Sequence, residues 1–260
     1  MHMPSRFLAS LLVAALAAQG GAQSLSQQLR AANGTVQVLF PSKQNVCGDG
    51  QGSISNIMGH AEFSSYDGST SFGTTNRYRR CEHGPARLVL TVLGGEVTRA
   101  RLYVGPVPSA SDVRTINATA GDAEAWLADM VERGSARVAS DLLLPLIVAD
   151  GSEPWKLFLK LARDENRPRE LKRSAMMWLS NAVSDHLGIL DETDRTDEDE
   201  LRAQAVYVLT QRPKAEGVPA LIDVAKSSSH PSARKAAIYW LGQTGDPRAV
   251  DVYADLLGLR

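Results

Sequence analysis

The stretch Lys-Ala-Ala-Ile-Tyr-Trp-Leu-Gly-Gln at residues 235–243 occurs in two related forms earlier in this chain of 260 residues. The relatives are Arg-Ser-Ala-Met-Met-Trp-Leu-Ser-Asn at 173–181 and Ala-Gln-Ala-Val-Tyr-Val-Leu-Thr-Gln at 203–211. The three copies align without a gap, and their starts are 30 and 32 residues apart. A helical unit that recurs at this interval buries its apolar face by stacking on its neighbours. The repeat therefore predicts an α-solenoid.

Each copy contains an Ala that is followed four residues later by a Leu, which places both side chains on one helix face. The pairs are Ala175 with Leu179, Ala205 with Leu209 and Ala237 with Leu241. We expect this face to be the seam between stacked helices, because the small Ala lets a neighbour approach while the Leu fills space. One further position is expected to pack between adjacent repeats, namely Trp178, Val208 and Trp240.

From residue 121 onward the apolar period is helical. It predicts helices at about 122–132, 136–149, 155–164, 169–184, 200–212, 218–227, 232–243 and 248–258. We expect Asp122, Ser232 and Asp246 to cap helices, and Pro145 to kink or split the second one. The first helix of the middle repeat would fall in 185–200, which is mostly acidic, so a loop or insertion is expected there.

The run Ala-Ile-Tyr-Trp-Leu-Gly-Gln-Thr-Gly-Asp-Pro-Arg-Ala-Val at 237–250 ends a helix pair that resembles HEAT repeats. The resemblance is to the subtype first noted in phycobilisome lyases. It covers about 155–257 well and 121–150 weakly. The resemblance implies an α-solenoid used for protein interaction, and it implies no chemistry of its own.

Residues 23–120 are expected to form a small β-rich domain that precedes the helical repeat domain of 121–260. The segment 35–40 alternates apolar and polar side chains, as a half-buried strand does. Two β-prone runs, 87–93 and 96–104, are joined by Gly94-Gly95, which is typical of a tight hairpin. We expect 105–120 to be a linker; the sequence does not assign the fold of 41–86.

Cys47 and Cys81 are the two cysteines of the chain. In an oxidising compartment a lone pair of cysteines is most simply a disulfide. Closing this loop would stabilise the domain by roughly 3–4 kcal/mol. The alternative, a metal-binding or reactive thiol pair, has no CxxC spacing to support it.

Residues 1–22 have the pattern of a cleavable signal peptide. Arg6 precedes an apolar run at 7–18, and Gly20 and Ala22 are the small residues expected before a cut at Gln23. An uncleaved signal anchor is the alternative. We expect the mature chain to be soluble and either secreted or periplasmic.

The composition favours neither nucleic acid nor a membrane surface as partner. The formal net charge is −1 and 43% of residues are hydrophobic, which is ordinary for a globular protein. The sequence contains no HExxH, GxSxG or GxxxxGK[ST] motif. We therefore expect a binding protein without enzymatic activity, cofactor or metal.

The alternative is an extracytoplasmic enzyme or enzyme accessory, lyase-like or hydrolytic, with a site near Cys47 and His83. Glu82 and His60 would be further members of that site, although the polarity of a surface loop is the favoured explanation for them. Other polar groups have simple explanations as turns or solvated loops. They are Asp49 and Asp67 among glycines, the acidic run 191–200, and the basic patch 77–80.

Met177, Tyr207 and Tyr239 occupy the same outward position of the three copies, two residues beyond the Ala. Tyr and Met are enriched in interface cores. Together with Arg173 and Lys235, these side chains are expected to line the inner surface of the solenoid and contact a protein or peptide partner. The alternative is ordinary packing between repeats. A second basic series, Lys172, Arg202 and Arg234, is expected to hydrogen-bond to inter-helix turns.

Overall fold

The computed structural model describes residues 24–55, 63–66, 69–72, 81–108, 113–189 and 196–259. The predicted signal peptide at 1–22 lies outside these ranges. So do His60, Asp67 and the basic patch 77–80. For 63–66 and 69–72 only the backbone is described.

The larger sheet has the strand order β7-β6-β1-β8. Its strands are β1 (Gly34–Phe40), β6 (Ala86–Leu93), β7 (Glu96–Val104) and β8 (Arg114–Asn117). The hairpin of β6 and β7 is confirmed, with Gly94 and Gly95 at φ 58° and 81° in its turn. Such positive φ angles favour glycine.

The prediction of a linker over 105–120 is wrong at β8, which pairs in parallel with β1. Ile116 faces the core of the protein with 3% of its surface exposed. A four-residue strand with one buried apolar side chain gives too little alternation to be recognised from sequence. The short helix α1 (Leu25–Arg30) precedes the sheet and begins with a capping box formed by Ser24 and Gln27.

The smaller sheet accounts for much of the segment that the sequence left unassigned. It contains β2 (Cys47–Gly48), β3 (Ser53–Ser55), β4 (Phe63–Tyr66) and β5 (Ser69–Phe72), paired antiparallel in chain order. The disulfide between Cys47 and Cys81 is confirmed, with the Cα atoms 5.1 Å apart. Beside it, Gly48 and Glu82 exchange two backbone hydrogen bonds of 3.0 and 2.9 Å.

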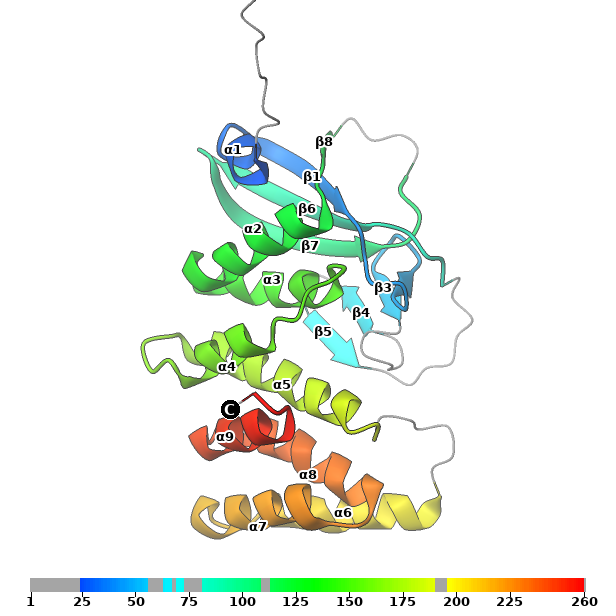
Figure 1. Ribbon diagram of the computed structural model, residues 1–260, viewed down its shortest axis with the longest axis vertical. Helices are drawn as coiled ribbons and strands as arrows, with labels where there is room; N and C mark the ends of the chain where they lie inside the picture. The colour runs from blue at the N-terminus through cyan, green and yellow to red at the C-terminus, as the bar shows by residue number, and fades with distance from the viewer. Residues whose placement is uncertain are drawn as a thin grey trace, which may run out of the picture.

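Helices α2 (Ala120–Arg133) and α3 (Ala136–Val148) pack beneath the larger sheet (Figure 1). Thr119 caps α2, so the expected cap Asp122 instead lies in the first turn, where it accepts a hydrogen bond from Thr119 Oγ1 at 2.8 Å. Pro145 lies within α3 without splitting it. The domain boundary between residues 120 and 121 stays a prediction, and α2 and α3 share a continuous apolar core with the sheet that precedes it.

The remaining helices form a stack of two layers, as Figure 1 shows. One layer holds α5 (Arg169–His186), α8 (Pro231–Thr244) and α6 (Asp197–Thr210), in that spatial order. The other layer holds α4 (Trp155–Arg163), α9 (Pro247–Leu256) and α7 (Lys214–Ser227). The helix stack predicted from the repeat is confirmed. As expected for the middle repeat, the chain passes from α5 to α6 with no intervening helix among the described residues.

The spatial order of the repeats differs from their order in the sequence. The third copy, in α8, lies between the first copy in α5 and the second in α6. Close packing joins α8 to α5: a Cβ atom added at Gly242 would lie 3.2 Å from the Cβ atom of Ser180. On the other side, Ser232 is not the expected cap of α8; its hydroxyl donates to Asp199 of α6 at 2.9 Å.

Helix α9 is held in the middle of its layer by polar contacts on both sides. Arg163 of α4 pairs with Asp251 at 2.9 Å, and Lys226 of α7 pairs with Asp255 at 2.9 Å. Tyr253, which is fully buried, donates its hydroxyl to the carbonyl of Ile238 in α8 at 2.6 Å. Asp246 caps α9 as predicted.

This order changes the seam that the repeat predicted. Ala175 and Ala237 are fully buried, whereas Ala205 is exposed. Val208 is 58% exposed, so its expected packing between repeats is wrong. The physical reason is the position of α6 at the end of the stack, where no described element lies against this side of the helix.

Candidate protein-interaction surface

The outward side of the layer formed by α5, α8 and α6 carries the candidate residues Met177, Tyr239 and Tyr207. Helix α8 lies between α5 and α6, so Tyr239 of α8 lies between Met177 of α5 and Tyr207 of α6 in the order of the helices. Tyr207 and Tyr239 are each 46% exposed, while Met177 is half-buried and packs against the core. The copies' equivalent positions therefore share one side of the layer, although in a different order from the sequence.

Two of these side chains form an aromatic cluster around Trp240. The ring of Tyr207 lies 5.0 Å from that of Trp240 across the contact between α6 and α8. The ring of Tyr239 lies 5.0 Å from Trp240 as well, in an edge-to-face arrangement. Ring pairs at these distances are attractive beyond their apolar burial. The sequence placed Trp240 between repeats; it did not reveal that this indole also supports the two exposed tyrosines.

The two candidate cations, Arg173 and Lys235, differ in their exposure to solvent. Arg173 is exposed on α5, one turn before Met177. Lys235 is half-buried on α8, one turn before Tyr239, and already interacts with another group of the chain. The equivalent residue of α6 is Ala203. Positive charge therefore lies toward the α5 and α8 side of the surface.

The second basic series behaves as structural support in part. Arg234 donates at 3.3 Å to the carbonyl of Ala225, which lies in the last turn of α7 and so close to, but not in, the predicted inter-helix turn. Arg202 instead pairs with Glu198 and Asp199 of its own helix at 2.6 and 3.2 Å. Its expected bond to an inter-helix turn is therefore replaced by bonds within α6.

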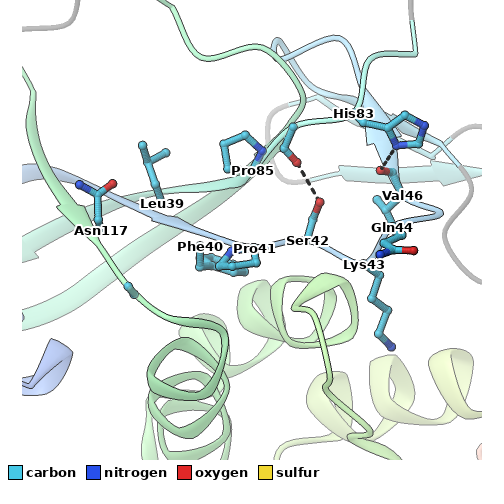
Figure 2. Close-up of a pocket in the computed structure, with 12 residues that line it drawn as sticks. Leu39, Phe40, Pro41, Ser42, Lys43, Gln44, Val46, His83, Pro85 and Asn117 are labelled. Carbon is cyan, nitrogen blue, oxygen red and sulfur yellow. Dashed lines mark hydrogen bonds between the residues drawn. The ribbon is translucent and has the colours of Figure 1, made fainter.

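A separate pocket of about 600 Å³ lies where β1 and β8 end, and Figure 2 shows its lining. Two polar side chains of this pocket, Ser42 and His83, face backbone carbonyls of the protein. Ser42 donates to the carbonyl of Gly84 at 2.8 Å, and Nδ1 of His83 lies 3.2 Å from the carbonyl of Val46. The hydroxyl of Ser42 and the ring of His83 each face a different backbone carbonyl (Figure 2), so the described residues of the pocket are not arranged as a nucleophile paired with a base.

Lys43, at the edge of this pocket, points toward the helices below it in Figure 2. Burial raises the pKa of Asp185, near the end of α5, and the positive charge of Lys43 opposes this increase. The two side chains therefore interact electrostatically across the junction between the sheets and the stack.

Cys47 cannot act as a nucleophile while it is bonded to Cys81. Asp49 closes a turn by accepting hydrogen bonds from the backbone amides of Gln51, Gly52 and Ser53 at 2.8 to 3.0 Å. Burial raises the pKa of Asp49, but these hydrogen bonds outweigh it and lower the pKa overall. In the part of the chain that the structure describes, no three His, Cys, Asp or Glu side chains are grouped to hold a metal ion.

No helix within residues 24–55, 81–108, 113–189 and 196–259 combines the length and the apolar character needed to cross a membrane. The longest, α5, has buried and exposed sides that alternate with the helical period.

Comparison with known protein families finds a match within the helix stack. Residues 187–258, which include α6, α7, α8 and α9, match the family model of HEAT repeats. No curated protein and no solved structure matches the chain. The family match does not distinguish the phycobilisome-lyase subtype. The paired, layered helices and this match lead to one conclusion: the carboxyl-terminal helix stack matches HEAT repeats, and the match itself spans residues 187–258.

Proposed function

We propose that this chain is an exported, non-enzymatic scaffold that binds a protein or peptide partner across the outward side of α5, α8 and α6. HEAT repeats are consistent with such a role, because stacked helix pairs present extended surfaces and carry no reactive group in their motif. The partner would contact Met177, Tyr239 and Tyr207, with Arg173 and Lys235 at the border.

The observation that carries this proposal is the aromatic cluster. Two tyrosines that are each 46% exposed rest on one indole, so their rings are already ordered before a partner arrives. Ordered aromatic side chains lose little conformational entropy on binding, and Tyr and Trp are enriched among the residues that dominate interface energies. A purely solvated helix face would not need this arrangement.

Export is supported by two observations of different kinds. The disulfide between Cys47 and Cys81 points to an oxidising compartment. Residues 1–22 have the pattern of a signal peptide, which would leave a β-rich domain from 23 to 120 and the helical domain from 121 to 260. We propose a secreted or periplasmic location on these grounds.

An enzymatic site near Cys47 and His83 is not favoured. The thiol of Cys47 is used in the disulfide, and the ring of His83 lies against a backbone carbonyl. Protein binding therefore accounts for more of the observed geometry than catalysis does.

The decisive experiment is quantitative binding of the purified chain to a partner recovered from the extracytoplasmic fraction of its own source. The variant Tyr207→Ser with Tyr239→Ser removes both exposed rings and leaves Trp240 in place. We expect it to weaken binding by at least about 30-fold, the loss typical of central aromatic contacts. Isothermal titration calorimetry or surface plasmon resonance measures the change in the dissociation constant.

A matched control is Leu93→Ser, which removes another large exposed apolar side chain, 58% exposed, from the end of β6. This control should bind the partner as the unmodified chain does. Equal binding by the double-tyrosine variant, in a protein whose circular dichroism is unchanged, would refute the proposed surface.

A further inference from the structure

The end of the stack exposes an apolar stripe on α6. Leu201 is 64% exposed and Val208 is 58% exposed, and Ala205 between them is exposed too. These residues are separated by four and three positions, so they lie on one side of the helix. In repeat proteins a terminal unit normally presents a polar outer side, which keeps the array soluble. Helix α6, at the end of this stack, presents apolar side chains where a polar outer side would be expected, and none of the described residues covers them.

The stripe corresponds to a side that binds another helix elsewhere in the stack. Val208 is equivalent to Trp240 of α8, and Trp240 lies against Tyr207 of α6. The same side of α6 therefore has the apolar composition of a helix-packing surface. Figure 1 places α6 and α7 at the end of the stack farthest from the sheets.

Charges at the two ends of the stripe have opposite signs. Asp197, exposed, begins the helix one turn before Leu201, and Arg212, exposed, follows the carboxyl-terminal cap one turn after Val208. Along the helix, the stripe begins with the acidic Asp197, continues with the apolar Leu201, Ala205 and Val208, and ends with the basic Arg212. This pattern is complementary to itself when it is reversed.

We propose that two copies of this chain associate through the α6 stripe, with the helices antiparallel about a twofold axis near residues 204 and 205. Asp197 and Arg212 lie equally far from that midpoint on opposite sides, and so do Leu201 and Val208. The axis therefore brings Asp197 of one copy beside Arg212 of the other, and Leu201 beside Val208. Such an interface is isologous, as in most protein dimers.

The stack contains an internal precedent for a contact between equivalent sides. Ser180 and Gly242 stand at the same position of their repeats, five residues after Ala175 and Ala237. They approach each other where α5 meets α8. In the contact between α5 and α8, equivalent sides of two repeats face each other. In the contact between α8 and α6, different sides face each other, because Trp240 lies against Tyr207. The predicted dimer repeats the first arrangement between two molecules.

Sedimentation velocity of the purified chain over a series of concentrations tests the proposal. The dimer fraction should rise with concentration, because a single helix pair is a small interface. The variant Leu201→Glu with Val208→Glu should weaken dimerisation by at least about 30-fold. Leu93→Glu, a charge placed on an exposed leucine of the β6–β7 hairpin, is the matched control and should leave the dimer unchanged.

Charge reversal tests the antiparallel register. Asp197→Arg and Arg212→Asp should each weaken the dimer about fivefold, because each places like charges opposite one another. The double variant should restore the original affinity. A third test uses Ala205→Cys: both native cysteines are in a disulfide, so oxidation should link two copies at this position, whereas Glu96→Cys in the hairpin should not link them.

A chain that remains monomeric over the whole concentration series overturns the proposal. So does a dimer that survives Leu201→Glu with Val208→Glu, since its interface would then lie elsewhere. If the paired charge reversal fails to restore affinity, the antiparallel arrangement is wrong. Circular dichroism of each variant excludes loss of folding as the cause.

Discussion

Helices α8 and α6 carry the same repeat motif but occupy different places in the stack. In α8, Ala237 and Leu241 are completely buried between α5, α6 and the opposite layer. In α6, the equivalent Ala205 is exposed and Leu209 is only half-buried. The difference teaches that the motif determines which side of a helix is apolar, while the stacking order determines whether that side is covered.

The largest expected difference between the two helices comes from truncating the shared leucine. Leu241→Ala should lower the free energy of unfolding by about 2–5 kcal/mol, because it leaves a cavity in a fully packed site. Leu209→Ala should cost only about 1 kcal/mol, since this side chain is already partly in contact with water. Urea denaturation followed by circular dichroism measures both. Equal losses would mean that α6 is covered in solution and that the contrast with α8 does not hold.

A second contrast concerns Gly242 of α8 and Thr210 of α6, which stand at the same position of their repeats. A Cβ atom at Gly242 would lie 3.0 Å from the Tyr253 hydroxyl and 3.2 Å from Ser180. Gly242→Leu should therefore destabilise the protein by about 1–3 kcal/mol through overpacking. Thr210→Leu should change stability by less than about 0.5 kcal/mol, because Thr210 is only half-buried. Thermal unfolding of the two variants gives the comparison, and tolerance of leucine at 242 would refute the close packing of α8 on α5.

The smallest expected effect is a pH dependence that belongs to α6. Hydrogen bonds from the hydroxyls of Thr196 and Ser232 lower the pKa of Asp199 to about 2 from its usual 3.8. A lowered pKa in the folded state contributes stability above pH 3.8, and this contribution is lost as the pH falls toward about 2. Helix α8 begins at Pro231, and the preceding His230 provides no side-chain cap, so α8 has no equivalent carboxylate.

The variant Asp199→Asn should therefore unfold with a weaker pH dependence than the unmodified chain between pH 3.8 and about 2. Urea midpoints measured across this interval provide the test. Asp223→Asn, at an exposed residue of α7, is the control and should retain the original dependence. Parallel curves for the unmodified chain and Asp199→Asn would show that the hydrogen bonds from Thr196 and Ser232 to Asp199 do not contribute to this pH dependence.

The sequence predicted the helices well, because their apolar period and their boundaries are both local features. Asp246 followed by Pro247 begins α9 as expected. The stacking order could not be predicted, since the Ala and Leu seam is the same in all three copies. What distinguishes α8 is Gly242, whose lack of a side chain permits the close approach to α5. That contact joins residues far apart in the chain, and no local pattern signals it.

The candidate surface was predicted in direction but incompletely in content. Tyr207 and Tyr239 face outward as the helical wheel indicated, and their role in binding stays a prediction. The support that Trp240 gives to Tyr207 depends on α6 lying beside α8. The sequence analysis did not predict strand β8 for a related reason. Its parallel partner β1 is distant in sequence, so no hairpin turn indicates that the two strands pair.

The central position of α8 and α9 has a consequence for how the protein is made. The ribosome releases α6 and α7 after α4 and α5 but before α8 and α9, the helices that connect the two pairs. The array therefore closes from its middle, and the last helices to emerge complete the contacts on both of their sides. Until then the nascent α6 and α7 have only each other to pack against. Their apolar sides are exposed during this interval, which is when a chaperone would be most needed to prevent aggregation.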